Sequence, residues 1–167
     1  MTKTTTLALY GGVALGLAAL DQWIKRLVVE TMELYERIDV MPFLSWFHTR
    51  NTGIAFSFLS GFDDTAMVAL TFAVMLFIGF LAVRTAGSQH LARLGFAFIL
   101  GGALGNIIDR AMHGYVVDYV LLHAGSWSFA VFNLADAAIS VGAVLVILQE
   151  FLDWRGWPTR RDPPPAG

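Results

Sequence analysis

Four long apolar stretches constrain the fold of this chain more than any other feature. Residues 7–20, 65–83, 94–108 and 131–148 are almost free of charged side chains. A helix that crosses a bilayer needs about 20 predominantly apolar residues. The second stretch is long enough alone, and the first and third become so when neighbouring apolar residues are included. The pattern therefore predicts an all-α membrane protein with four transmembrane helices.

The low charge content of the chain agrees with this prediction. Of the 167 residues, 14% are charged, whereas soluble domains usually carry about a quarter charged residues. The formal net charge of −2 gives no basic patch, so nucleic acid is not an expected partner. The chain contains no cysteine, which excludes disulfides, thiol nucleophiles and cysteine-ligated metals.

A pair of opposite charges follows the first apolar stretch. Asp21 and Lys25 are four residues apart and can form an ion pair on one helix face. Two interpretations of Asp21 stay open, an ion pair at the membrane edge or a residue that supports a functional site. The cationic start at Lys3 is also typical of a signal peptide, but the apolar character continues past Asp21, which favours a retained helix.

Residues 30–64 form the longest polar segment. Within it, residues 43–48 and 54–58 are rich in aromatic side chains and are predicted to be strands, with a turn at residues 50–53. We therefore expect a small β-hairpin on the bilayer surface, with Trp46 at the interface. From the sequence alone, Asn51 is interpreted as a turn residue.

Glycines mark the third apolar stretch, at Gly95, Gly101, Gly102 and Gly105. Small residues let membrane helices approach closely, so we expect this helix at the centre of the bundle. Four spans place both termini on one side, and the distribution of Lys and Arg favours the cytoplasm. The sequence thus predicts one membrane domain over residues 1–154 and a disordered cytoplasmic tail over residues 155–167.

Polar side chains collect again at the predicted outer ends of the third and fourth helices. They are Asn106, Asp109, Arg110, Asp118, Asn133 and Asp136. Ionisable side chains at membrane depth are costly and usually functional. Two close carboxylates, such as Asp118 and Asp136, cannot both ionise easily, so one keeps a proton while the other stays charged. Such a pair suits peptide hydrolysis by an activated water molecule.

Structural roles for these acids stay open at this point. Asn133 and Asp136 have the spacing of a helix N-cap and its N3 residue. Asp109 and Arg110 have the charges of an interfacial ion pair, and a further structural interpretation makes Asp118 a loop acid exposed to water. Acids in membrane helices also serve as proton relays, so a small proton-coupled transporter is a competing function and a non-enzymatic assembly factor is a third.

Other catalytic motifs are absent from the sequence. The chain has no His-Glu-x-x-His motif for zinc and no Gly-x-Ser-x-Gly motif for a serine nucleophile. We expect all four histidines to be solvated or interfacial. They are His48, His90, His113 and His123.

Five short motifs occur in the order found in a known family. They are Asp21-Gln22-x-x-Lys25, Asn51-Thr52-Gly53-x-Ala55-Phe56-Ser57, Gly105-Asn106-x-x-Asp109-Arg110, Val117-Asp118-Tyr119 and Phe132-Asn133-Leu134-Ala135-Asp136. Through these motifs, nearly the whole chain resembles the lipoprotein signal peptidases (signal peptidase II), a family of bacterial membrane aspartyl proteases.

The resemblance implies a fold and an activity. It implies four helices in the bacterial inner membrane, cytoplasmic termini, an extracytoplasmic site, a small sheet that cradles the substrate and a mobile flap over residues 113–128. It implies cleavage of prolipoproteins before a lipobox cysteine that carries diacylglyceryl, without a metal or an organic cofactor. Membrane lipid is the other expected partner, and we expect a monomer.

The resemblance also implies roles for nine residues. The catalytic aspartates correspond to Asp118 and Asp136. Positions that line the site or contact substrate correspond to Asn51, Asn106, Arg110 and Asn133, and positions that support its structure correspond to Asp21, Lys25 and Asp109.

Overall fold

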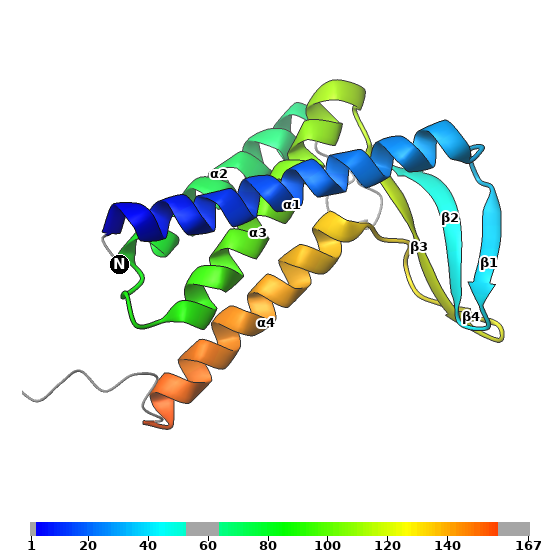
Figure 1. Cartoon of the computed structure of the whole chain (residues 1–167). Coiled ribbons are helices and arrows are strands. Elements are labelled where there is room, and N and C mark those ends of the chain that lie inside the picture. Colours follow the sequence, from blue (N-terminus) through cyan, green and yellow to red (C-terminus); the bar gives the residue numbers. More distant parts are fainter. Residues whose placement is uncertain (1–2, 53–63, 157–167) are drawn as a thin grey trace, which may run out of the picture.

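The computed structural model describes residues 3–52 and 64–156, with a bundle of helices and a small antiparallel sheet beyond one end of it (Figure 1). The helices are α1 (Lys3–Thr31), α2 (Asp64–Arg84), α3 (His90–His113) and α4 (Leu134–Trp154). Each helix contains one of the four predicted apolar stretches or most of it. Three of them, α1, α3 and α4, are long and apolar enough to cross a membrane, and the described apolar part of α2 is shorter, at Phe72–Arg84.

The outer faces of the helices are strongly apolar. Leu15, Phe77, Val144 and Ile147 are each more than half exposed. Exposed apolar surface of this extent is unfavourable in water, whereas acyl chains solvate it. The chain is therefore a membrane protein of helices with a small sheet.

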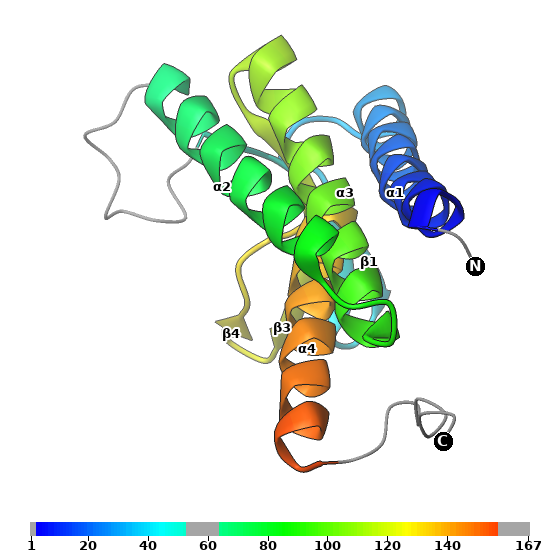
Figure 2. The same cartoon turned by 90° about the vertical axis from the view of Figure 1, so that its left-hand side faces the viewer.

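Helix α3 lies at the centre of the bundle and contacts each of the other three helices (Figure 2). Its glycines allow this close approach. A Cβ atom on Gly95 would lie 2.5 Å from the backbone oxygen of Gly142 in α4, and one on Gly101 would lie 2.6 Å from the backbone oxygen of Ala14 in α1. The predicted central position of the third helix is confirmed.

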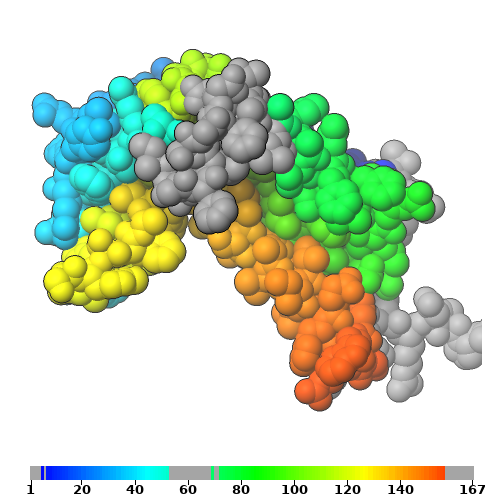
Figure 3. All heavy atoms as spheres, turned by 180° about the vertical axis from the view of Figure 1, so that it is seen from behind, coloured from blue at the N-terminus to red at the C-terminus, as the bar shows by residue number. Residues whose placement is uncertain are grey.

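The sheet has the strand order β1-β2-β3-β4, and all neighbouring strands are antiparallel. The strands are β1 (Arg37–Met41), β2 (Leu44–Asn51), β3 (Val116–Ala124) and β4 (Trp127–Ser128). Thr49 of β2 pairs with Asp118 of β3, and Asn51 pairs with Val116. This register brings the end of β2 to the start of β3, close to the ends of the helices. In the space-filling view, the sheet forms a lobe that projects beyond the helices (Figure 3).

The structure corrects the predicted hairpin. Arg50 and Asn51 belong to β2 and are not turn residues, and β2 pairs with β1 and β3. The predicted strand over residues 54–58 lies outside the described residues. Of the two described partners of β2, β3 is more than 60 residues away in sequence, and a local pattern does not reveal it.

Residues 113–128, the segment predicted to be a mobile flap, consist largely of β-strands. Most of residues 113–128 form β3 and β4, and β3 is hydrogen-bonded to β2 along most of its length. The first four residues of β3 are all buried, so the strand lacks the alternation of apolar and polar side chains that marks a surface strand.

The helix ends divide into two groups, one near the sheet and one away from it. The start of α1, the connection between α2 and α3, and the end of α4 lie at the end away from the sheet (Figure 1). The end of α1, the end of α3 and the start of α4 lie toward the sheet. The predicted disordered tail is described only for Arg155 and Gly156, and the remainder of it lies outside the described residues.

Candidate active site

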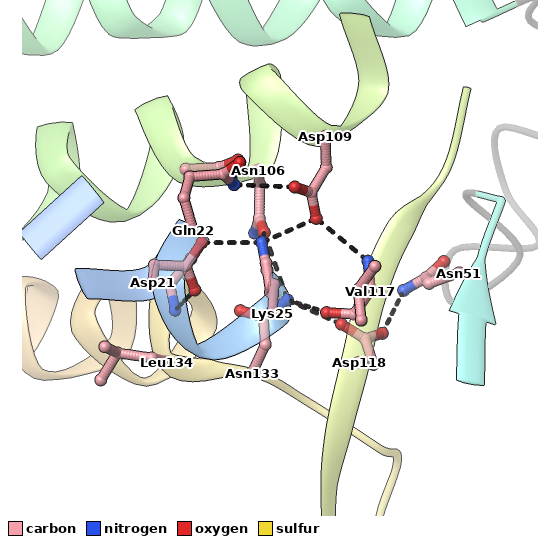
Figure 4. A network of polar contacts seen from close by, with 12 residues as sticks. Asp21, Gln22, Lys25, Asn51, Asn106, Asp109, Val117, Asp118, Asn133 and Leu134 are labelled. Atoms are coloured by element: carbon pink, nitrogen blue, oxygen red, sulfur yellow. Dashed lines mark hydrogen bonds and ion pairs between the residues drawn. The ribbon is translucent and has the colours of Figure 1, made fainter. Parts of the chain in front are cut away.

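A buried polar cluster lies where the sheet meets the ends of α1, α3 and α4 (Figure 4). Its members are less than 10% exposed and are Asp21, Lys25, Asn106, Asp109, Asp118 and Asn133. Buried polar groups are costly unless they are hydrogen-bonded, and buried charges unless they are paired. The contacts within the cluster meet both requirements.

The start of α4 is fixed by side chains from other parts of the chain. The first N–H groups of a helix have no partner within the helix. Asn133 Oδ1 accepts from the Asp136 N–H at 2.9 Å, and the Asp136 carboxylate accepts from the Asn133 N–H at 3.3 Å. The two N–H groups before that of Asp136 donate to the Tyr119 hydroxyl of β3 and the Asp21 carboxylate of α1, at 3.1 and 2.9 Å. The capping interpretation of Asn133 and Asp136 is therefore confirmed.

Asp118 projects from β3 into the cluster and is 2% exposed, so the interpretation as a solvated loop acid is wrong. Its Oδ1 accepts from Asn133 Nδ2 at 2.7 Å, and its Oδ2 accepts from Asn51 Nδ2 at 3.0 Å. Burial raises the pKa of Asp118 to about 6, and the negative charge of Asp136 contributes to this rise. The two amide donors oppose the rise because they stabilise the charged form.

Asp136 reaches the same cluster from the first turn of α4. Its Oδ1 accepts from Asn106 Nδ2 at 2.8 Å. Asn106 Oδ1 in turn accepts from Asn133 Nδ2 at 3.2 Å, and the same Nδ2 donates to Asp118. Two asparagine amides therefore connect the two carboxylates. The cap of α4 therefore has two roles. It satisfies the first N–H groups of the helix, and it positions Asp136 toward the cluster that contains Asp118.

An ion cluster supports this arrangement from the other side. Lys25 Nζ lies 2.8 Å from Asp21 Oδ2 and 2.9 Å from Asp109 Oδ2. The Asp109 carboxylate also accepts from the Val117 N–H at 3.0 Å and from Gln22 Nε2 at 2.7 Å. The predicted pairing of Asp21 with Lys25 is confirmed, and the pair is buried within the protein.

Arg110 differs from the other predicted site residues. Its side chain is half-buried and makes no hydrogen bond or ion pair within residues 3–52 and 64–156. The predicted ion pair between Asp109 and Arg110 is wrong, because Asp109 is bound to Lys25. The Arg110 guanidinium therefore keeps its donors available.

Sequence reasoning missed the roles of two neighbours of the predicted site residues. Gln22 Nε2 donates to Asp109 and to the Gly105 backbone oxygen at 3.0 Å, which ties α1 to α3. Burial raises the pKa of Tyr119 to about 12, so its hydroxyl stays protonated while it caps α4. Gln22 and Tyr119 both lie within the family motifs quoted above. Their presence in those motifs was the sequence signal that could have indicated a role in the site.

The prediction for the histidines is wrong for His48. It lies within β2, is 3% exposed, and its Nδ1 is 3.1 Å from the Met32 backbone oxygen. His90 and His113 are exposed at helix ends, and His123 is half-buried in β3. Across the part of the chain that the structure describes, no group of three His, Asp or Glu side chains is arranged to hold a metal ion. The chemistry available from the cluster is that of two coupled carboxylates with amide donors.

Comparison with known proteins identifies the family of this chain. A family model described as signal peptidase (SPase) II matches residues 13–152, which is most of the chain. The chain belongs to the signal peptidase II family. Membership of this family makes the chain a membrane-embedded protease, and it gives no support to the transporter hypothesis or to a non-enzymatic role.

Individual relatives agree with the family match. The chain is 51% identical over 154 residues to the lipoprotein signal peptidase of Mesorhizobium japonicum, covering 92% of each protein. It is 55% identical over 136 residues to the lipoprotein signal peptidase of Brucella ovis, covering 81% of this chain and 85% of that protein.

Two solved structures share the fold, and both are described as bacterial membrane enzymes determined by the in meso method. The one at 1.9 Å resolution has a TM-score of 0.79 and 27% identity, and the comparison covers 88% of this chain and 95% of that chain. The one at 2.3 Å resolution has a TM-score of 0.81 and 26% identity, with coverages of 94% and 96%. The likeness extends over the sheet and the helices together.

Proposed function

We propose that this signal peptidase II protein removes signal peptides from prolipoproteins, with Asp118 and Asp136 as its catalytic pair. One observation carries the proposal. The amides of Asn106 and Asn133 connect two carboxylates from different elements, and burial together with the charge of Asp136 raises the pKa of Asp118. When two carboxyl groups interact closely, one tends to keep a proton while the other is charged.

The pair supplies both proton transfers of peptide hydrolysis. The charged carboxylate takes a proton from a water molecule as the water oxygen attacks the scissile carbonyl carbon. The protonated carboxyl donates a hydrogen bond to the carbonyl oxygen and stabilises the gem-diol intermediate. Collapse of the gem-diol breaks the carbon–nitrogen bond, and the leaving nitrogen receives a proton from the pair. The reaction needs no covalent intermediate, and we propose no metal or organic cofactor.

The remaining site residues take supporting roles in this proposal. Asn51, Asn106 and Asn133 orient the carboxylates, as their hydrogen bonds to Asp118 and Asp136 support. Asp21, Lys25 and Asp109 hold α1 and α3 in place beneath the pair. Arg110 binds oxygen atoms of the substrate, because its guanidinium donors are otherwise unused in the described parts of the chain.

The proposed substrate carries a diacylglyceryl group on the cysteine that follows the cut. Burial of acyl CH₂ groups contributes about 0.8 kcal/mol each, so the lipid can supply much of the affinity. The exposed apolar faces of the helices suit an enzyme that meets its substrate within the bilayer. We propose that a monomer is sufficient, because the pair and its supporting residues all come from one chain.

We propose that α2 is the fourth transmembrane helix, that both termini are cytoplasmic, and that the site is extracytoplasmic. Helix α2 has 21 residues, which is enough to span the hydrocarbon core. The start of α1 and the end of α4 lie at the same end of the bundle, away from the sheet (Figure 1). On this proposal, residues 1–154 form one protease domain and residues 155–167 form a cytoplasmic tail.

A cleavage assay with purified protein tests the proposed function. A prolipoprotein is offered in detergent with and without its diacylglyceryl group, and loss of the signal peptide is followed by gel shift. We expect cleavage of the lipidated form alone. Absence of cleavage by a folded enzyme would refute the proposal, and equal cleavage of both forms would refute the role of the lipid.

A further inference from the structure

The buried ammonium of Lys25 makes three contacts, and only two of them are with carboxylates. Its Nζ lies 2.8 Å from Asp21 Oδ2, 2.9 Å from Asp109 Oδ2 and 2.9 Å from Asn106 Oδ1 (Figure 4). An ammonium group has three N–H donors and no acceptor. Nζ donates a hydrogen bond to Asn106 and can accept none, so Asn106 must present its oxygen, not its nitrogen, to Lys25.

The direction of the Asn106 amide decides what the Asp136 carboxylate receives. With Oδ1 turned to Lys25, Nδ2 faces Asp136 Oδ1 at 2.8 Å. Oδ1 also accepts from Asn133 Nδ2 at 3.2 Å, so both of its lone pairs are occupied. An amide donor stabilises a charged carboxylate. A reversed amide would instead place its oxygen against the carboxylate and favour the protonated form.

We propose that Lys25 is a positioning residue for the catalytic pair, because it fixes the amide of Asn106 so that Asp136 receives an N–H donor. This inference rests on the proposed function of Asp118 and Asp136. It gives Lys25 an effect on the chemical step, in addition to its ion pairs with α1 and α3. Lys25 acts through Asn106 and makes no contact with the Asp136 carboxylate.

Several charged groups surround this connection, and the test must separate their effects. Asp21 lies beside Lys25 on α1, Asp109 on α3, and Asp118 on β3. Removal of the Lys25 charge alone would leave two buried carboxylates without a cation, which is strongly destabilising. Lys25→Met combined with Asp109→Asn removes the ammonium but keeps the summed formal charge of Asp21, Lys25 and Asp109 unchanged.

The experiment measures the pH–rate profile for cleavage of a diacylglyceryl-modified prolipoprotein in detergent. Wild type, Lys25→Met and the charge-balanced double variant are compared, and folding is checked by size-exclusion chromatography and thermal unfolding. We expect the acidic limb of the profile to move up by about one pH unit in the folded variants, which corresponds to the loss of one hydrogen bond to a charged group. We expect kcat to fall and KM to stay unchanged.

Gln22→Leu is the matched control from the same helix. It removes the hydrogen bonds to Asp109 and to the Gly105 backbone oxygen but leaves the contact between Lys25 and Asn106. We expect a lower Tm and an unchanged pH profile. A folded double variant with the wild-type profile, or an equal displacement in Gln22→Leu, would overturn the role of Lys25. Failure of the wild type to cleave would instead refute the proposed function itself.

Discussion

The Arg110 side chain makes no hydrogen bond or ion pair within the described residues, and this sets its expected effect on catalysis. Arg110→Ala should raise KM by about 10-fold or more, as expected for the loss of hydrogen bonds to charged or polar substrate oxygens. Tm should change little, because the side chain supports no described contact. Steady-state kinetics and thermal unfolding measure the two effects. A large fall in Tm with an unchanged KM would show that Arg110 has a structural role.

Asp118 gives the folded protein a specific dependence on pH. Its folded pKa of about 6 is above the unfolded value of 3.8, so the folded state binds a proton that the unfolded state releases. This group therefore destabilises the protein above pH 6, and the penalty fades as the pH falls toward 4. Between pH 8 and pH 5, wild type should gain about 1 kcal/mol of unfolding free energy relative to Asp118→Asn.

The comparison with Asp118→Asn isolates this effect from the other acids, and Asp39 supplies a control of opposite sign. The pKa of Asp39 is lowered by its hydrogen bonds to Ser45 and Arg37, so its contribution to stability is present at neutral pH and is lost below about pH 4. Denaturant unfolding in detergent at several pH values measures both. An Asp118→Asn variant that tracks wild type at every pH would contradict the raised pKa.

At the scale of elements, the contact between α3 and α4 positions Asp136. A Cβ atom on Gly102 would overlap the Ala135 backbone oxygen and lie 2.9 Å from the Ile139 side chain. Gly102→Ala should therefore displace the first turn of α4, cost about 1 to 3 kcal/mol, and reduce kcat. Gly16→Ala is the control, because a Cβ atom on Gly16 would meet no atom within 4 Å. Equal Tm and activity in the two variants would show that the contact does not position the pair.

The helices and the strand that became β2 could be predicted from sequence, whereas the pairing of the strands could not. Helices follow from local hydrophobicity, and the cap at Asn133 and Asp136 follows from local spacing. The pairing of β2 with β3 joins segments separated by all of α2 and α3, and no local pattern specifies such a pairing. Sequence reasoning therefore paired the predicted strand over residues 43–48 with the nearest aromatic segment, residues 54–58.

Most contacts between site residues could not be predicted from local sequence patterns either. The spacing of Asp21 and Lys25 predicted their ion pair, but the contact of Lys25 with Asn106 spans 81 residues of sequence. The approach of Asp118 to Asp136 depends on the same long-range packing. The resemblance to a family indicated Asp118 and Asp136 as site residues before the structure did, but it did not give the pairing of β2 with β3.

At the scale of the whole molecule, the two ends of the bundle should lie on opposite sides of the membrane. The chain contains no cysteine, so single cysteines can report exposure. Ser126→Cys, between β3 and β4, should react with a membrane-impermeant thiol reagent in intact cells. Ser88→Cys, between α2 and α3, should react only after the cells are permeabilised. The reverse pattern would place the termini outside the cytoplasm.

The whole molecule also explains why buried Asp118 is tolerated beside half-buried Asp136. Burial of Asp118 beside Asp136 is unfavourable, and the surrounding amides, the helix cap and the Lys25 ion cluster offset it. The helices contribute the apolar exterior, and the sheet contributes Asn51 and Asp118. Neither the helices nor the sheet alone contain the complete site.

The decisive measurement compares cleavage of a lipidated prolipoprotein by wild type, Asp118→Asn and Asp136→Asn, with Asp39→Asn as a control on an exposed acid of the sheet. Both site variants should lose at least about 1,000-fold in kcat while retaining the wild-type elution volume, because each carboxyl has its own proton transfer. Asp39→Asn should cleave at the wild-type rate. Substantial turnover by either purified site variant would contradict the assignment of Asp118 and Asp136 as the catalytic pair.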